Sequence, residues 1–320
     1  MIPSRCRRVA LFSRPLLFLS ALFLSGCSTV QYRLFHPADS IANVEWHYTI
    51  IDVAVMLLII LPITLMIALF LWRYRKSRNA AYDPNWSHSL SLELLMWGVP
   101  LIIVVVLGYY SYQSTMLVNP YRPSVLAKSA AADAPLQVDV VTTDWQWLFI
   151  YPQQGIATID DLVVPQGRVV DLRLTSASVV NTFFIPQVAP MIDVMPGMRT
   201  KDAFAVNRVG NYEGYSADFS GEGFSWMQFS TRIVTPSDFA AWVSQTQAAP
   251  HKLDYAQFRQ LARPTVNVGA KPAYFSGVDP DLFEEVYHAA LQGVVYPVPA
   301  DLPIPVPAKT AATQAGPARS

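Results

Sequence analysis

Two long runs without a charged side chain constrain this chain more than any other feature of its sequence. Val53–Trp72 holds twenty residues and Leu94–Val118 holds twenty-five, and about twenty apolar residues let a helix cross a hydrocarbon core of about 30 Å. Only 14% of the residues are charged, against about 25% in soluble proteins. The sequence therefore predicts a hairpin of two transmembrane helices within residues 48–118.

The basic residues around the first run set its orientation. Four of them lie in the segment 73–78, whereas residues 28–52 contain only Arg33 as a lysine or arginine. The positive-inside rule then places the connecting loop, about residues 73–92, in the cytoplasm. Both ends of the chain are expected on the outer, periplasmic side of a bacterial inner membrane.

Residues 1–26 are typical of an export leader, with an arginine-rich start, an apolar run over 16–24 and the small residues Ser25 and Gly26. Leu-Ser-Gly followed by Cys27 resembles the processing site of bacterial lipoproteins, whose cysteine is acylated by chains such as palmitate. The prediction is a lipid anchor at Cys27, followed by a periplasmic segment over 27–47. An ordinary signal peptide with a chance cysteine is the alternative.

From Leu136 onward, short β-rich runs separated by turn residues predict a sandwich or small barrel over residues 119–248. The runs are 136–141, 145–151, 162–165, 169–176, 181–186, 202–206, 211–218 and 227–234. Apolar periodicity predicts a helix over 236–247 and weaker helices over 254–262 and 280–291, in a C-terminal arm of 249–295. Proline and alanine then dominate a tail over 296–320, which is predicted to be unstructured.

Three motifs follow one another in the outer domain: Asp144-Trp-Gln-Trp147 with Tyr151, Asn181-Thr-Phe-Phe-Ile-Pro186 with Asp193, and the segment 216–227. In this order, and after two predicted spans, they resemble subunit II of the heme-copper oxidases. The resemblance implies a membrane α-helical hairpin plus an all-β cupredoxin-like barrel, with the small helical arm behind it.

In the cytochrome c oxidases of this family, the second motif supplies a histidine and the third supplies C-x-x-x-C-x-x-x-H-x-x-M, and together they hold two copper ions. The matching positions here are Asn181, Ser216, Ser220, Phe224 and Met227, with Asp218 where the family has a glutamate. Copper at such a site needs thiolates and imidazoles. The sequence has no histidine between His88 and His251 and no cysteine after Cys27, so no metal or other cofactor is predicted in this chain.

The sequence keeps the spacing of the ligand positions but lacks the ligands themselves. In this respect it resembles subunit II of the cytochrome bo-type ubiquinol oxidases. The resemblance implies a non-catalytic subunit of a respiratory enzyme that passes electrons from ubiquinol to oxygen and translocates protons. Hemes and one copper would lie in subunit I, the main partner, with subunits III and IV and membrane lipid as further partners. Neither cytochrome c nor nucleic acid is expected to bind, the latter because no concentrated basic face is visible.

Two other functions are alternatives to this one. The first is a free-standing cupredoxin-like lipoprotein used in binding or assembly, and the second is a copper-containing cytochrome c oxidase subunit. The missing ligands disfavour the second, and the sequence around Glu93 disfavours the first. Co-purification with a heme-containing subunit would separate these functions.

Glu93 lies at the start of the second predicted span. An acid in the first turn of a helix interacts favourably with the helix dipole, by about 0.3–1 kcal/mol, and this alone could explain it. The family resemblance implies a second role, at the cytoplasmic entrance of a proton path into subunit I. Glu93 is therefore a candidate proton-entry residue.

Overall fold

The structure is a computed structural model that describes residues 36–75, 88–119, 134–266, 271–294 and 296. The predicted leader, Cys27, most of the predicted cytoplasmic loop and nearly all of the C-terminal tail lie outside these residues. The export leader, the lipid anchor and the unstructured tail therefore stay predictions.

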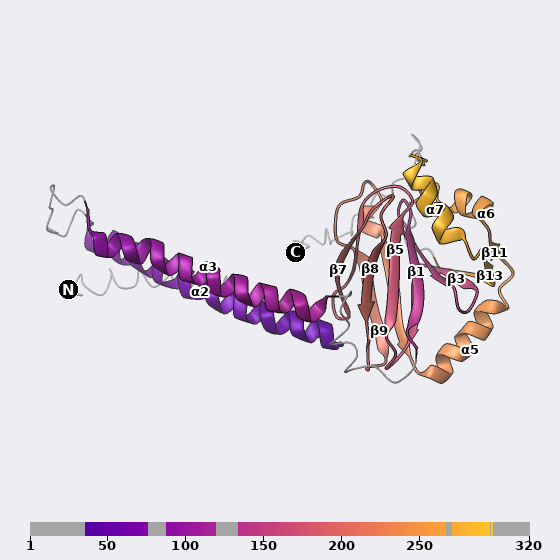
Figure 1. Cartoon of the computed structure of the whole chain (residues 1–320), viewed down its shortest axis with the longest axis horizontal. Helices are drawn as coiled ribbons and strands as arrows, with labels where there is room; N and C mark the ends of the chain where they lie inside the picture. The colour runs from indigo at the N-terminus through magenta and orange to yellow at the C-terminus, as the bar shows by residue number, and fades with distance from the viewer. Residues whose placement is uncertain (1–35, 76–87, 120–133, 267–270, 295, 297–320) are drawn as a thin grey trace, which may run out of the picture. The chain divides into compact units, whose positions relative to one another are not determined.

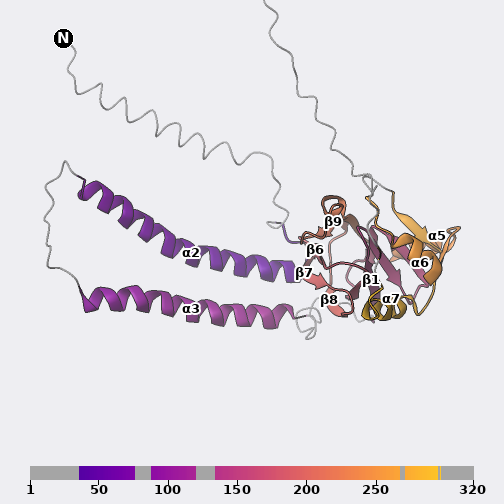
Figure 2. The same ribbon diagram turned by 90° about the horizontal axis from the view of Figure 1, so that it is seen from above.

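Both predicted spans are helices. Helix α2 covers Ser40–Arg73 and helix α3 covers Leu90–Val118, antiparallel to it (Figures 1 and 2). Their mean hydropathies are 3.0 and 2.4 in the most apolar windows, and none of either window is buried within the chain. At about 1.5 Å per residue, the 34 residues of α2 are longer than a hydrocarbon core requires, so the helix begins well before the apolar run.

The outer domain is a sandwich of two β-sheets (Figure 1). One sheet has the strand order β12-β3-β2-β1-β5-β8 and the other β4-β10-β9-β6-β7. Pairing is mostly antiparallel, but β1 runs parallel to β5 and β4 parallel to β10. The first ten strands are β1 (Leu136–Thr142), β2 (Trp147–Tyr151), β3 (Ile156–Ile159), β4 (Asp161–Pro165), β5 (Val170–Ser176), β6 (Asn181–Ile185), β7 (Ala189–Val194), β8 (Thr200–Phe204), β9 (Gly210–Ser216) and β10 (Gln228–Val234).

The main core lies between the two sheets. Strand β10 alternates buried and more exposed positions, as expected for a strand with one face on a core. Its Phe229 packs against Phe183 of β6 and against Trp147 and Phe149 of β2, with ring centroids 5.1–5.3 Å apart. These aromatic contacts join the two sheets at their centre.

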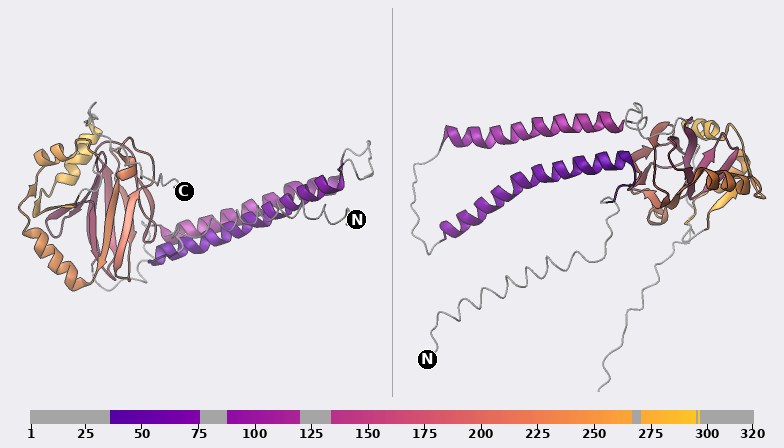
Figure 3. Two further views of the ribbon diagram at one scale, coloured as in Figure 1. Left: turned by 180° about the vertical axis from the view of Figure 1, so that it is seen from behind. Right: turned by 90° about the horizontal axis from the view of Figure 1, so that it is seen from below.

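The C-terminal arm covers the other face of the six-stranded sheet (Figure 3). Strands β2 and β3 are buried at every position, because one face contacts the main core and the other contacts the arm. A second cluster joins Leu148, Ile150 and Ile159 of the sheet to Phe258 of α6 and Phe283 of α7. Helix α5 (Pro236–Gln247) precedes the arm and packs on the main core through Phe239 and Trp242. The arm consists of β11 (Lys252–Leu253), α6 (Tyr255–Leu261), β12 (Ala273–Phe275), β13 (Gly277–Val278) and α7 (Leu282–Leu291).

Sequence signals explain where the helices that follow strand β10 begin. Thr235 accepts a hydrogen bond from the Asp238 backbone N–H, and Pro236 occupies the first turn of α5. Asp254 and Gln257 form a capping box at the start of α6. The predicted helix over 236–247 is confirmed, and those predicted over 254–262 and 280–291 are one or two residues shorter at their ends.

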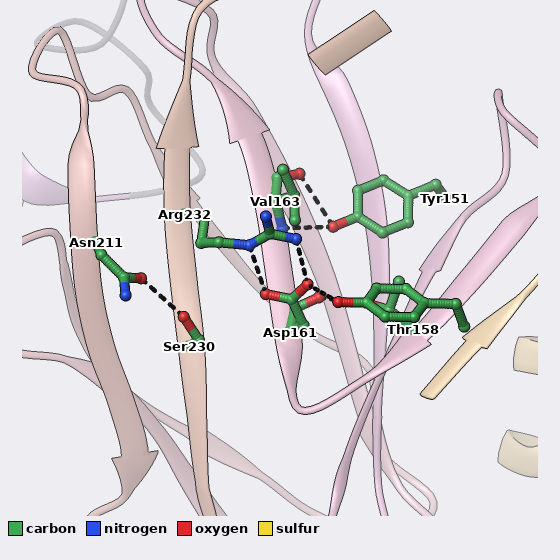
Figure 4. Close-up of polar contacts among 8 residues, drawn as sticks. Tyr151, Thr158, Asp161, Val163, Asn211, Ser230 and Arg232 are labelled. Carbon is green, nitrogen blue, oxygen red and sulfur yellow. Dashed lines mark hydrogen bonds and ion pairs between the residues drawn. The ribbon is translucent and has the colours of Figure 1, made fainter. Parts of the chain in front are cut away.

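A buried carboxylate attaches the arm to the edge of the sandwich (Figure 4). Asp161 is 2% exposed and accepts two hydrogen bonds from the Arg232 guanidinium, at 3.0 and 2.6 Å. The Tyr274 hydroxyl of β12 donates a third at 2.8 Å. Three charge-assisted bonds offset the cost of burying this carboxylate.

The predicted fold class is confirmed, and eight β-rich runs correspond to strands. The sequence analysis missed β3, β7 and the three short strands of the arm. Strand β7 contains Pro190 and β12 has only three residues, so neither carries a clear alternating pattern. Strand β12 forms because Ala273 pairs with Ile159 of β3, a contact between residues distant in sequence.

Replacing Arg232 by methionine should destabilise the outer domain, because Asp161 would remain buried without its cation. Breaking a buried ion pair costs about 3–5 kcal/mol, and the partial exposure of Arg232 places the expected loss near about 3 kcal/mol. Ser230→Ala is the matched control, since Ser230 lies on the same strand as Arg232 and its hydroxyl donates only an exposed bond, to Asn211 of β9, and it should cost less than about 0.5 kcal/mol. Denaturant unfolding of the full-length chain in detergent, followed by tryptophan fluorescence, measures both. Equal stability of the two variants would contradict the role of Arg232.

Candidate functional site

The first of the former ligand positions, Asn181, begins strand β6 and is completely buried. Its amide nitrogen lies 3.1 Å from the Thr142 hydroxyl and 3.3 Å from the Val179 carbonyl. The amide nitrogen therefore bonds to the neighbouring β-structure. The amide oxygen is buried without a hydrogen-bond partner among the described residues, and an amide is a poor substitute for the imidazole that copper at such a site requires.

Ser216 ends strand β9, and its hydroxyl oxygen accepts from the Thr182 backbone N–H at 3.3 Å. The Thr182 hydroxyl lies 2.9 Å from an Asp218 oxygen and 3.0 Å from an Asp193 oxygen. The loop is also tied down by the Ala217 N–H, which donates to the Thr182 carbonyl. Hydrogen bonds between strand β6 and the loop thus hold together residues that match metal-ligand positions.

Met227, the retained ligand type, is 1% exposed and belongs to the main core. Phe224 begins a short 3-10 turn, η2 (Phe224–Trp226), and its ring contacts that of Phe219 at 5.7 Å between centroids. Phe219 itself is 79% exposed. The histidine position of the motif is therefore filled by an aromatic side chain that packs within the loop, and the methionine is a core residue.

The Trp145 side chain packs against the loop over residues 216–227. It is 4% exposed, and its indole N–H donates to the Ser220 carbonyl at 2.9 Å. A Cβ atom added at Gly221 or Gly223 would lie 2.8 or 2.2 Å from the indole ring, so these glycines let the backbone approach the ring closely. Both tryptophans of the Asp144–Trp147 motif are core residues, and Trp145 also fixes the course of the loop.

An open pocket of about 380 Å³ lies beside this loop. Its walls combine three aromatic side chains with hydroxyl and amide groups. They are formed by Phe184, Tyr215, Ser216, Ala217, Phe224, Ser225 and Gln228. The lining offers no thiolate, imidazole or carboxylate, so it has the character of a packing surface and not of a metal site.

Metal-binding side chains do not gather in the part of the chain that the structure describes: no three His, Cys, Asp or Glu residues lie there as a possible ligand set. Asp193 and Asp218 are close to one hydroxyl group, but two carboxylates, hydroxyls and a thioether are poor replacements for bridging thiolates. The geometry supports a loop organised by hydrogen bonds and aromatic packing.

Glu93 lies in the first turn of α3, as predicted, and its carboxylate is 2.8 Å from Nδ1 of His88. The two side chains are about half exposed, 49% for Glu93 and 60% for His88. The Ser89 side chain forms no capping hydrogen bond, although its carbonyl accepts from the Glu93 N–H at 3.0 Å. The sequence analysis missed His88, whose position five residues before an acid at a helix start was the available signal.

Two family models match the outer domain. The model described as "Cytochrome C oxidase subunit II, periplasmic domain" matches residues 150–234, and the one described as "COX Aromatic Rich Motif" matches residues 247–289. The second match coincides with the arm that covers the six-stranded sheet. The solved periplasmic domain of subunit II of cytochrome oxidase from Bradyrhizobium japonicum is 25% identical, with a TM-score of 0.34, over 35% of this chain and 94% of that chain.

Curated relatives match most of the chain. The cytochrome bo(3) ubiquinol oxidase subunit 2 of Pseudomonas putida is 40% identical over 269 residues, which cover 83% of this chain and 82% of the relative. The ubiquinol oxidase subunit 2 of Acetobacter aceti is 37% identical over 277 residues, covering 86% and 87%. The similarity therefore extends over the hairpin as well as the outer domain.

The full-length chain, expressed alone and purified in detergent, should contain no stoichiometric copper. Adding copper should produce no thiolate–copper absorption, because no cysteine follows Cys27. The unfolding midpoint of the outer domain should be unchanged by a chelator, since its core needs no metal binding energy. Metal analysis and visible spectroscopy measure this, and a bound dinuclear copper centre would contradict the prediction.

Proposed function

The chain belongs to the family of the ubiquinol oxidase subunits 2 and is the second subunit of such a respiratory complex, and we propose that within it the chain carries no redox centre. The observation that supports this proposal is the state of the former ligand positions. Asn181 is hydrogen-bonded to the sandwich, and Met227 is part of its core. Such side chains leave electron transfer to other subunits.

The hemes and the copper of the oxygen-reducing site are accordingly proposed to lie in subunit I, with ubiquinol as the electron donor of the complex. Membership of a multi-subunit oxidase implies subunit I as a partner. Subunits III and IV are proposed as further partners, and cytochrome c is not expected to dock. The sandwich would cover subunit I on the periplasmic side, and the helices α2 and α3 would anchor the complex in the membrane.

The proposed topology places the α2–α3 connection in the cytoplasm. Helix α2 ends at the basic residue Arg73, and Arg75 and Lys76 follow it in the sequence, as the positive-inside rule requires. Glu93 and His88 begin the next helix and would therefore face the cytoplasm. The outer domain would lie in the periplasm, and the chain would reside in the bacterial inner membrane.

Glu93 is proposed to collect protons for subunit I. Its carboxylate contacts the His88 imidazole at 2.8 Å, and both remain accessible to water. Carboxylate and imidazole are the groups most often used to transfer protons, and ionisable groups at a membrane boundary often mark proton paths. The exposed pair can exchange protons with the cytoplasm without any movement of the fold.

Glu93→Gln should lower quinol-driven oxygen consumption per heme by about tenfold while the complex still assembles. Positioned proton-transfer groups contribute about 10²–10⁴-fold, and water can replace part of that contribution at an exposed site. Glu93→Asp should do less harm. Asp52→Asn, which removes an acid near the opposite end of the hairpin, is the control and should leave turnover unchanged. Wild-type turnover in Glu93→Gln, with normal heme content, would leave Glu93 with its helix-dipole role alone.

A lipid anchor at Cys27 is also proposed. Mass spectrometry of the mature N-terminus should find a diacylglyceryl-cysteine, and Cys27→Ala should remove it. The variant should remain in the membrane fraction, because two transmembrane helices anchor a protein far more firmly than acyl chains do. Release of the variant into the periplasm would contradict the two-span topology, and an unmodified cysteine in the wild type would contradict the anchor.

A further inference from the structure

The segment that leads into helix α2 docks on the edge of the sandwich. The Ala38 N–H donates to the Gln187 carbonyl at 2.9 Å, and Asp39 forms an antiparallel bridge with Val206. Two residues further, Ile41 is 2% exposed and packs in a small cluster with Ala203 of the edge strand β8. The outer end of α2 is therefore attached by backbone contacts to the turn between β6 and β7 and to the segment just after β8, and by a small apolar contact to β8 itself.

Carboxyl groups gather at this junction. Asp202 of β8 and Asp39 are each only 3% exposed, and both Asp39 and Glu45 of α2 act electrostatically on Asp202. One Asp202 oxygen accepts from the Ala203 N–H at 2.8 Å. The other is buried and has no hydrogen-bond partner among the residues that the structure describes. An ionised carboxylate in this position would be costly, because a single hydrogen bond offsets only part of its desolvation.

The charged groups on the neighbouring strands are engaged elsewhere. On β5, the residue opposite Asp202 is Leu172, while Arg173 is paired with Asp139 and Asp171 interacts with Lys201.

On β7, Asp193 accepts from the Thr182 hydroxyl. From the N-terminal side, Asp39 and Glu45 face Asp202. Burial, together with these two carboxyl groups, raises the pKa of Asp202 to about 7 from an ordinary value of 3.8. Asp39 directly precedes α2, where the helix dipole favours a negative charge, so the proton belongs on Asp202.

We propose that this junction is a proton-dependent clasp, in which protonated Asp202 keeps the entry of α2 docked on strand β8 and ionised Asp202 loosens it. A protonated Asp202 has a hydroxyl that can donate to a neighbouring carboxylate, whereas an ionised Asp202 adds a buried charge beside two acids. The clasp lies at the opposite end of the hairpin from Glu93 and does not depend on the proton-entry role.

The direction of the pH effect follows from the raised pKa. The docked state binds the Asp202 proton more tightly than an undocked, hydrated state does. The contribution of the Asp202 proton to docking is therefore complete below a pH of about 4, and it is lost as the pH rises through about 7. Acid in the outer compartment tightens the junction, and neutral to alkaline conditions loosen it.

Hydrogen exchange in the purified, lipid-reconstituted oxidase tests the clasp. The reporters are amides that bond across or next to the junction, those of Ala38 and Asn43. After correction for the intrinsic pH dependence of exchange, their protection should fall by up to about tenfold per pH unit between pH of about 5 and 7 and then level off. Asp202→Asn, which is neutral at all pH values, should give a flat profile.

The exposed acid Glu222 provides a matched control, because Glu222→Gln removes a carboxylate of the loop after β9 that forms none of the contacts named at the junction and should keep the wild-type slope. If Asp202→Asn does not assemble, Asp39→Asn decides the question, since removing a neighbouring charge should move the midpoint to lower pH. A flat wild-type profile, an unchanged slope in Asp202→Asn, or an unchanged midpoint in Asp39→Asn would each overturn the proposal.

Discussion

The outer domain depends on the stacked contact between Phe183 and Phe229. Their ring centroids lie 5.3 Å apart with an interplanar angle of 19°, and Trp147 and Phe149 surround Phe229. Gly214 makes the contact possible, because a Cβ atom there would lie 2.1 Å from the Phe229 ring. Strands β6, β9 and β10 are fixed by this packing, and they carry or flank the positions that match metal ligands in the resemblance. The loop can therefore keep its course without metal binding energy.

A second constraint is the part of the six-stranded sheet formed by β2 and β3, which is buried on both faces. A sheet of this kind cannot leave one face in water, so the arm is part of the fold and not an appendage. Its α7 is also held electrostatically, because Glu284 pairs with Arg199 and lies 3.7 Å from Arg173. Arg173 in turn lies over the Phe283 ring at 4.9 Å. The aromatic residue Phe283 of the arm thus takes part in the contacts that hold α7 on the sheet.

Local sequence patterns predicted what depends on local physics. The two spans, the helix over 236–247 and most strands follow from apolar runs, periodicity and caps. Strand β12 and the burial of Asp161 depend on pairing between distant segments, which no window of sequence contains. The same holds for Trp145, whose role comes from Gly221 and Gly223 more than seventy residues away. Motif spacing indicated which residues make up the candidate site, but the hydrogen bonds that organise it, such as that of Trp145 with Ser220, join segments distant in sequence.

Burial distinguishes Glu93 from Asp202, the two carboxyl groups for which we propose roles that depend on a proton. Glu93 is about half exposed and contacts an imidazole, so water can deliver and remove its proton while the helices stay in place. Asp202 is nearly inaccessible and lies beside other acids, so its proton can exchange only when the docked segment opens. Exchange at Glu93 is therefore compatible with repeated proton transfer in a catalytic cycle. Exchange at Asp202 is coupled to a change of structure, which suits a response to the steady pH of the outer compartment.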